Sequence, residues 1–447
     1  MVVTIALASG LWTTVRTDGM TGDARHDLRW RWTLTAEARL LAAADLDRLA
    51  PSPKSKPLAS PPAWPGFRGA DRSSVVPDLR IDTDWEANPP TELWRRPIGP
   101  GVGSFSAADE LVFTQEQRGD LELVSAYLLA TGEPVWRHED PVRFWDSHAG
   151  AGPRATPTIS GDRVYTLGGT GLLNALDRHS GTRLWSRDLA AELGVSSSGW
   201  GFAGSPVVVG DLVIVAAIGT LAAYDAEKGT PRWTAPDGGD SYSSPHLARI
   251  DGVEQVMLLA ANGLTSVAPQ DGTVLWTHPS PIASRVVQPA LTPDGDILVS
   301  GDTFSGLERV AVSRAGKTPG AWSTEALWTT RGLKPYFNDF VVHEGHAYGF
   351  DGSILSAVRL DTGERVWKGG RYGAGQMLLL PEQDLLLVLS ERGDVALVEA
   401  VPDGYTERAR MTAIDGKTWN HPVVVDDLLL VRNTEEMAAF RLPRSTR

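Results

Sequence analysis

The sequence of 447 residues contains no cysteine. This absence excludes disulfide bonds, thiolate metal sites, a thiol nucleophile and the cysteine that carries the lipid of a lipoprotein. The sequence also lacks a Gly-x-Ser-x-Gly stretch, which excludes the usual nucleophile of α/β-hydrolases. The redox compartment of the protein stays open.

Long hydrophobic runs are missing as well. Residues 2–12, VVTIALASGLW, are apolar but shorter than the roughly 20 residues that a membrane-spanning helix needs. No Lys or Arg precedes them, as the first part of a signal peptide would require. Two interpretations remain open: a buried N-terminal segment, or the distal part of a membrane anchor that begins upstream of Met1.

The chain has fewer positively than negatively charged residues. The chain has 42 Lys and Arg against 55 Asp and Glu, which gives a net charge of -13. Because nucleic-acid binding needs a dominant basic face, we expect no nucleic-acid partner. The content of 42% hydrophobic and 22% charged residues is that of a globular protein with a large core.

The first 65 residues differ in composition from the rest. Thr35 as a cap and Glu37 in the first turn predict a helix that runs to about Ala50 and ends at Pro51. Residues 51–65 contain six prolines and no apolar period, which indicates an extended linker. We therefore divide the chain into an apolar segment and helix (1–50), a linker (51–65) and a main domain (66–443).

Tryptophans recur at regular intervals in the main domain. Successive members of the series are separated by 42, 49, 48, 43, 52 and 39 residues: Trp94, Trp136, Trp185, Trp233, Trp276, Trp328 and Trp367. A four-stranded propeller blade takes about 40 to 50 residues, so the spacing predicts an all-β propeller. Within each period, short apolar runs alternate with turns, as in 205–233, where 207–209 and 212–216 flank a Gly-Asp turn.

The number of blades follows from counting these units. They begin near Ser104, Thr156, Ser205, Ser244, Gln288, Asp339, Gly375 and His421. The last unit supplies only three strands, whereas residues 92–96 form a strand without a blade of its own. Pairing the two closes the ring and leaves no open sheet edge. We predict eight four-stranded antiparallel blades, with seven as the alternative if one irregular unit is misread.

A short motif accompanies the tryptophans. The pattern Ala-x-Asp-x-x-x-Gly-x-x-x-Trp is complete twice, at Ala175, Asp177, Gly181, Trp185 and at Ala223, Asp225, Gly229, Trp233. It resembles the tryptophan-docking repeat of pyrroloquinoline quinone (PQQ) propellers, a family that includes quinoprotein alcohol dehydrogenases and outer-membrane barrel-assembly propeller lipoproteins. The stretch WPGFRGADR (64–72) resembles the beginning of bacterial members of that family. The resemblance covers residues 64–443 and implies an eight-bladed or related propeller.

The motif residues suit packing better than ligand binding. Gly allows a turn with positive φ, Asp bonds backbone amides, and Trp offers a large apolar face with one N–H. A cofactor would occupy one site, whereas the motif recurs around the ring. We expect a structural docking role for these residues and for Trp136, Trp276 and Trp367.

Ligand binding is expected where the units differ, at the residues that lead into each innermost strand. These residues ring the mouth of the central channel and include five Lys or Arg, which suit a carboxylate or phosphate. The candidates are Arg154, Tyr242, His246, Arg285, Gln288, Lys334, Asn338, Asp339, Arg371, Gln376, Lys417, Trp419, Asn420 and His421. The alternative is that they are solvated loop residues that offset nearby acids. Aromatic residues in the same segments could stack on a planar ligand or fill the channel: Trp145, Trp200, Phe202, Tyr336, Phe337 and Tyr372.

Quinone chemistry remains the alternative function. The resemblance implies an Asp base and a calcium-bound PQQ, and Asp339 beside Asn338 offers suitable oxygen ligands. The pair is a weak candidate for catalysis, since Asp339 could equally bond backbone amides. HEGH (343–346) falls at a hairpin turn and lacks the spacing of a zinc site.

We therefore expect a monomeric, noncatalytic binding or scaffold propeller of the periplasm or cell envelope. Its expected partner is an envelope protein or a small anionic ligand, and an N-terminal membrane anchor stays open. The alternative is a PQQ-dependent alcohol dehydrogenase.

Overall fold

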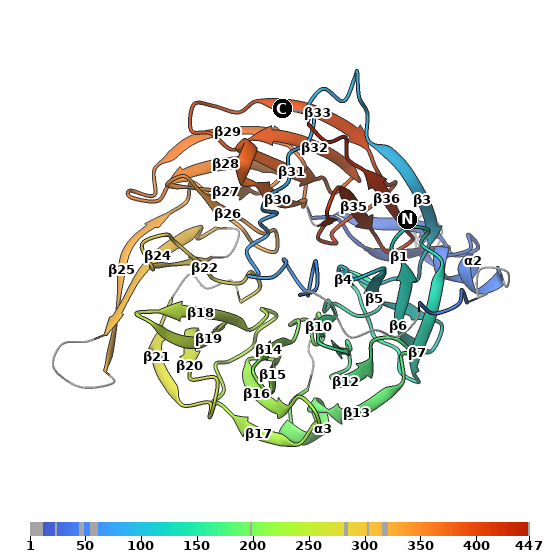
Figure 1. Cartoon of the computed structure of the whole chain (residues 1–447), viewed down its shortest axis with the longest axis horizontal. Coiled ribbons are helices and arrows are strands. Elements are labelled where there is room, and N and C mark those ends of the chain that lie inside the picture. Colours follow the sequence, from blue (N-terminus) through green and yellow to red (C-terminus); the bar gives the residue numbers. More distant parts are fainter. Residues whose placement is uncertain are drawn as a thin grey trace, which may run out of the picture.

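The computed structural model describes residues 12–22, 25–43, 49–53, 61–196, 199–280, 285–301, 304–314 and 321–445. Within these residues, eight four-stranded antiparallel sheets surround a central channel (Figure 1). The predicted eight-bladed all-β propeller is confirmed, and the seven-bladed alternative is wrong.

Blades 1 to 4 each consist of four strands that are consecutive in the chain. Blade 1 contains β4 (Ser106–Ala108), β5 (Leu111–Arg118), β6 (Leu121–Leu128) and β7 (Pro134–Asp140). Blade 2 contains β10 (Thr158–Ser160), β11 (Arg163–Leu167), β12 (Leu172–Asp177) and β13 (Arg183–Asp188). Blade 3 contains β14 (Val207–Val209), β15 (Leu212–Ala217), β16 (Thr220–Asp225) and β17 (Pro231–Thr234). Blade 4 contains β18 (His246–Ile250), β19 (Val253–Ala260), β20 (Gly263–Val267) and β21 (Val274–His278).

Blades 5 to 7 follow the same order, and blade 8 joins the two ends of the ring. Blade 5 contains β22 (Ala290–Leu291), β23 (Ile297–Ser300), β24 (Leu307–Arg314) and β25 (Trp322–Thr330). Blade 6 contains β26 (Val341–His343), β27 (His346–Asp351), β28 (Ile354–Arg359) and β29 (Arg365–Arg371). Blade 7 contains β30 (Gln376–Leu380), β31 (Leu385–Leu389), β32 (Asp394–Glu399) and β33 (Glu407–Thr412). Blade 8 contains β34 (Val423–Val425), β35 (Leu428–Arg432), β36 (Glu436–Arg441) and β3 (Thr91–Pro97).

The closing strand β3 pairs antiparallel with β36, and Trp94 lies opposite Ala439. This is the pairing that the unmatched strand at residues 92–96 suggested. Because the first and last strands of the ring share one sheet, no blade of the ring is left with three strands.

Strands that are apolar on both faces explain how the blades pack. In β15, Val213 and Val215 join the core shared with blade 2, whereas Ile214 and Ala216 join the core shared with blade 4. Successive side chains of a strand point to opposite faces of the sheet, so a blade between two neighbours needs apolar residues at every position.

Each docking tryptophan packs against the next blade. The Trp136 indole lies on Gly181, where an added Cβ would come within 2.4 Å of the ring, and its Nε1 donates to the Arg178 carbonyl at 3.0 Å. Trp185 repeats this arrangement with Gly229 and donates to the Ala226 carbonyl. These contacts are packing contacts between neighbouring blades.

Blade 5 interrupts the series. It lacks the docking Gly, and the preceding Trp276 instead donates to Gln255 Oε1 in its own blade at 2.7 Å. The irregular sequence of this unit forms the long strands β24 and β25, which project beyond the ring in Figure 1.

The motif aspartates shape the docking turns. The carboxylate of Asp177 accepts hydrogen bonds from the backbone N–H groups of His179 and Ser180. The carboxylate of Asp225 does the same for Glu227 and Lys228. Each Asp therefore stabilises the turn that presents the next Gly to a tryptophan.

An N-terminal extension precedes the ring. It consists of a hairpin of β1 (Val15–Met20) and β2 (His26–Trp30), which the sequence reading did not foresee, and of helix α2 (Ala36–Ala42). Thr35 caps α2 as predicted, by accepting a hydrogen bond from the N–H of Ala38. The prediction of a helix to about Ala50 is wrong, because α2 ends at Ala42 with Ala43 as its C-cap, and Ala50 is not helical but donates its N–H to the Pro134 carbonyl of blade 1. The described residues contain no helix long and apolar enough to span a bilayer.

Smaller elements decorate the loops between blades. They are the short pair β8 (Trp145–Asp146) and β9 (Gly150–Ala151) and helix α3 (Leu189–Leu193), while the 3-10 turn η2 (Pro381–Gln383) connects β30 and β31 within blade 7. The HEGH stretch forms the turn between β26 and β27, where Glu344 and Gly345 have positive φ.

Candidate binding site at the channel mouth

A cavity of about 250 Å³ lies at the end of the channel where the innermost strands begin. Its wall includes eight of the fourteen predicted mouth residues: Arg154, Tyr242, Arg285, Gln288, Asp339, Gln376, Trp419 and His421. These residues come from six segments that are far apart in the sequence, and the ring brings them together because every innermost strand starts at this end.

The floor of the cavity is a segment that the sequence reading did not place there. Residues 61–81, drawn in blue, run into the centre of the ring in Figure 1. Phe67 from this plug segment lines the cavity and contacts His421 edge to face, with ring centroids 5.9 Å apart. Two isolated β-bridges connect the plug segment to the ring. Its Trp64 pairs with Ala107 of blade 1, and its Val75 pairs with Leu379 of blade 7.

Two buried arginines hold the plug segment to the ring. Arg72 donates to the carbonyl of Pro245 at 2.8 Å and also to the carbonyl of Pro206. Arg68 donates to the carbonyl of Phe340 at 2.9 Å and forms an ion pair with Asp339 at 3.1 Å. Burial, together with the nearby Arg68 cation, lowers the pKa of Arg72 to about 9. The two cations are therefore held by carbonyl oxygens and one carboxylate from blades 3, 4 and 6.

A hydrogen-bond chain links the plug segment to blade 8. Arg68 Nε donates to Ser74 Oγ at 2.7 Å, and Ser74 Oγ lies 2.9 Å from His421 Nε2. His421 Nδ1 lies 2.8 Å from the Pro422 carbonyl, which can only accept, so Nδ1 carries the proton and Nε2 accepts from Ser74. Burial lowers the pKa of His421 to about 4, although Asp339 opposes the shift.

Aromatic side chains form the opposite wall. Trp419 lies 6.1 Å from Trp200 and 5.7 Å from Phe337, between ring centroids, and Tyr336 contacts Phe337 at 5.4 Å. All four rings line the cavity. The wall offers flat apolar faces of the kind that bind a planar or apolar group.

Most of the cationic side chains predicted at the mouth form ion pairs within the protein. Arg154 pairs with Asp146, Arg285 pairs with Asp240 at 2.9 Å, and the Lys334 ammonium lies 2.6 Å from Asp351. The local excess of positive charge read from the sequence is therefore largely offset by carboxylates that come from other parts of the chain. Of the five predicted cations, Arg154 and Arg285 line the cavity.

The other six predicted residues lie outside the cavity wall, and each has another environment. Asn338 donates to the Gly375 carbonyl, Asn420 to the carbonyls of Gly101 and Gly103, and Arg371 to Ser353 Oγ. The Lys417 ammonium lies 4.7 Å from the Trp419 ring centroid. His246 is buried, and burial together with Arg68 and Arg72 lowers its pKa to about 3. Lys334 forms the ion pair already described.

Three of the other aromatic candidates also lie elsewhere. Phe202 and Tyr372 are buried between blades, whereas Trp145, in β8 between blades 1 and 2, is exposed. They do not contribute to the mouth.

The residues around Asp339 do not fit a calcium-held quinone. Its carboxylate faces Arg68 and His421, and its backbone N–H donates to Gln376 Oε1 at 3.2 Å. The Asn338 amide points to a backbone carbonyl instead of sharing a site with Asp339. Among the described residues there is no group of three or more His, Asp or Glu placed to hold a metal ion. In the described residues, the carboxylate of Asp339 and the amide of Asn338 therefore do not converge on one point as Ca²⁺ ligands do.

Comparison with known sequences gives a consistent family. A family model described as outer membrane protein assembly factor BamB matches residues 121–369. The BamB of Yersinia pestis is 26% identical over 288 residues, which cover 58% of this chain and 70% of that protein. The BamB of Moranella endobia is 25% identical over 282 residues, with the same coverage of both chains.

Solved structures show the same fold at low identity. The BamB of Moraxella catarrhalis is 15% identical, with a TM-score of 0.57 over 80% of this chain and 99% of that one. A quinohemoprotein alcohol dehydrogenase from Comamonas testosteroni is 12% identical, with a TM-score of 0.60 over 92% of this chain and 85% of that one. At such identities the likeness concerns the fold alone.

Proposed function

Because the chain belongs to the family described as outer membrane protein assembly factor BamB, we propose that it is a noncatalytic binding propeller that takes part in outer-membrane protein assembly. The family match over more than half of the chain supports this proposal. The assembly role places the protein in the periplasm or on an envelope membrane, with other envelope proteins as its partners.

The plug segment is the observation that favours a noncatalytic propeller over a quinoprotein. A quinoprotein needs a carboxylate that is available to its cofactor and metal. Here the carboxylate of Asp339 is committed to Arg68, which fastens the plug segment inside the channel.

Within this function we assign the channel mouth to a ligand that combines a flat apolar group with an anion. The aromatic wall would receive the flat group. The guanidinium of Arg285, 5.8 Å from the Tyr242 ring centroid, would receive a carboxylate or phosphate that competes with Asp240. The ligand is either a small molecule or a side-chain cluster of an envelope protein. Arg285→Gln should weaken its binding, whereas Arg371→Gln, outside the cavity, should not.

Deleting the gene in the bacterium that encodes this chain tests the assembly role. We expect the deletion to lower the amount of folded outer-membrane β-barrel proteins, measured by their heat-modifiable migration in gels. A plasmid copy should restore the amount. Unchanged levels of folded barrels after the deletion would contradict the proposal.

Calorimetric titration with PQQ and Ca²⁺, followed by a dye-linked alcohol oxidation assay, tests the absence of catalysis. We expect neither saturable heat nor turnover. Binding with turnover that Asp339→Asn abolishes would replace the binding propeller with an oxidoreductase.

A further inference from the structure

Exposed apolar side chains gather on the N-terminal extension. Of the thirteen large apolar side chains that are exposed in the described residues, seven lie within residues 12–49: Trp12, Leu28, Trp30, Trp32, Leu34, Leu41 and Leu49. The other six are spread over the whole propeller. A gathered apolar surface of this kind marks an interaction site, whereas scattered single residues do not.

The hairpin β1–β2 has two different faces. Arg16, Asp27 and Arg29 line a cavity of about 450 Å³ that the hairpin shares with blades 1 and 8. Leu28 and Trp30 alternate with these residues along β2 and therefore point away from the propeller. The Trp30 ring stacks on Trp32 with centroids 5.0 Å apart, which extends the outward face beyond the strand.

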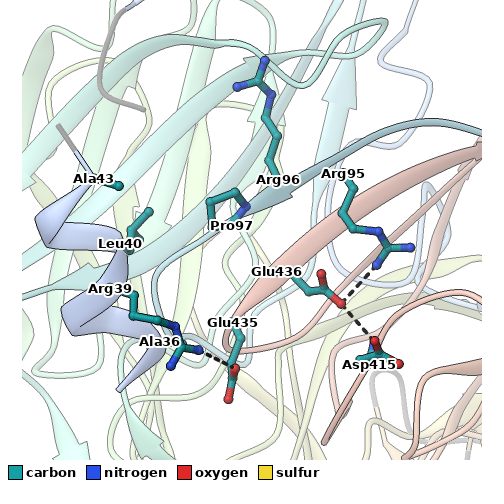
Figure 2. A pocket seen from close by; sticks show the side chains of 10 residues that line it. All are labelled: Ala36, Arg39, Leu40, Ala43, Arg95, Arg96, Pro97, Asp415, Glu435 and Glu436. Carbon is teal, nitrogen blue, oxygen red and sulfur yellow. Dashed lines mark hydrogen bonds and ion pairs between the residues drawn. The ribbon is translucent and has the colours of Figure 1, made fainter. Parts of the chain in front are cut away.

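Polar contacts fix the extension to the ring. Glu37 accepts a hydrogen bond from the Gly119 N–H and pairs with Arg143, both at 2.8 Å. Figure 2 shows Arg39 reaching from α2 to Glu435, at 3.6 Å, while Leu40 lines the cleft of about 620 Å³ between α2 and blade 8. The outward face is therefore held in place on the propeller.

The extension lies on the same side of the propeller as the channel mouth. The Met20 N–H donates to the His148 carbonyl at 2.7 Å, and the His148 ring stacks on Trp200 of the cavity wall at 5.0 Å. The Lys417 ammonium donates to the Met20 carbonyl at 3.2 Å. A surface that binds the outward face would thus lie next to the mouth.

The composition of the extension favours a lipid surface over a protein partner. Tryptophan prefers the boundary between lipid headgroups and acyl chains, and arginine beside it binds lipid phosphates. Residues 12–43 contain five arginines against four acidic residues in a chain of net charge -13. Residues 1–15, which run directly into β1, contain no charged residue. An anionic bilayer would therefore attract this face while the acidic ring stays away.

We infer that the outward face of the extension, formed by Leu28, Trp30 and Trp32 and flanked by the exposed Arg25 and Arg31, is a docking surface for an anionic lipid bilayer. It holds the propeller peripherally on a membrane, with the mouth on the membrane side. The inference rests on the extension alone and does not depend on the role proposed for the ring.

Flotation of the full chain with vesicles tests the inference. One vesicle preparation is pure phosphatidylcholine, and the other contains about 30% phosphatidylglycerol. We expect the chain to float with the anionic vesicles. Trp30→Ala combined with Trp32→Ala should lower the partition coefficient at least about tenfold, because two interfacial indoles are lost. Arg25→Gln combined with Arg31→Gln should reduce the preference for anionic vesicles.

Matched controls separate this surface from other causes. Leu184→Ala with Leu327→Ala changes two side chains on the blades that are as exposed, at 46% each, as Trp30 at 47%, and should leave flotation unchanged. Circular dichroism should show the same fold for all variants. Failure of the wild-type chain to float would overturn the inference. The inference would also be overturned if the Trp30→Ala, Trp32→Ala variant still floated and the Ile5→Ser, Leu7→Ser variant did not.

Discussion

Arg68 Nε lies 3.1 Å from Asp339 Oδ2 at the centre of the propeller, and both side chains are almost fully buried. The contact is an ion pair without the alignment of a hydrogen bond, since Arg68 Nε donates to Ser74 Oγ instead. Arg68 belongs to the plug segment and Asp339 to the loop before β26, so this pair ties the channel floor to blade 6. Burial lowers the pKa of Arg68, and Asp339 opposes that shift.

Removing one partner should therefore be costly. Arg68→Met leaves the Asp339 carboxylate buried without its cation, and we expect the free energy of unfolding to fall by about 3–5 kcal/mol in urea titrations. Arg80→Met, at an exposed position of the same segment, should change it by less than about 0.5 kcal/mol. The double variant Arg68→Met with Asp339→Leu should recover much of the loss. A double variant as unstable as the single one would contradict the importance of the ion pair.

The ring was predictable because its construction repeats in the sequence. Docking residues such as Trp185 and Gly229 belong to a motif that repeats at blade spacing. The strand around Trp94, which had no blade of its own, indicated how the ring closes. Helix α2 was predicted too long, because no Gly or Pro stands near Ala42 and the first helix-breaking residue after it is Pro51. The hairpin β1–β2 was missed, since its strands are short and β2 is mostly exposed, so that the sequence shows no buried apolar run there.

The site was only partly predictable. Order along the chain placed Gln288 and Gln376 at the mouth, because each precedes an innermost strand. Ion pairs between residues from different segments could not be predicted from the sequence. Lys334 was therefore assigned to the mouth, although its ion pair with Asp351 holds it outside the cavity. The plug segment was missed because its path depends on positive φ at Arg68 and Arg72. Arginine is not a residue type that predicts positive φ.

Docking glycines should resist substitution more than turn glycines that face solvent. Gly181 has φ +70°, and an added Cβ would lie 2.4 Å from the Trp136 ring. Gly210 has φ +60° with nothing within 4 Å of an added Cβ. Gly210→Ala should cost about 1–2 kcal/mol from backbone strain alone. Gly181→Ala should cost about 2 kcal/mol more, because the indole must move. Thermal unfolding checks this, and equal losses would show that the tryptophan contact adds nothing.

Acid should destabilise the channel. His421 and His246 are buried as neutral imidazoles, with pKa values that burial lowers to about 4 and about 3. The unfolded chain takes up these protons near pH 6.5 and the folded chain does not. The free energy of unfolding should therefore fall as pH drops from about 6.5 towards 4, by up to about 1.4 kcal/mol per pH unit for each histidine.

Glu122 opposes this trend. Burial raises the pKa of its carboxyl to about 7, against the hydrogen bond from the Gly169 N–H, so the folded chain holds one extra proton between about pH 7 and 4.5. That proton cancels the effect of one histidine. Glu122→Gln should therefore steepen the loss of stability between pH 6.5 and 5, measured by urea titration. His421→Gln should flatten it, and His26→Gln, at an exposed position, should leave it unchanged.

The stability of the contact between blades 8 and 1, here called the seam, should depend on the indole of Trp94. The Trp94 ring covers Gly132, where an added Cβ would lie 2.6 Å away, and its Nε1 donates to the Leu129 carbonyl at 2.9 Å. Trp94→Ala removes both contacts at the point where the chain ends meet, and we expect a loss of about 3–5 kcal/mol. Faster amide exchange in β3 and β36 than in blade 4 would locate the loss at the seam. Trp145→Ala, at a tryptophan that is 55% exposed, serves as the control and should leave both measurements unchanged. Uniformly faster exchange in Trp94→Ala would instead mean that the eight blades unfold as one unit and that the seam has no separate stability.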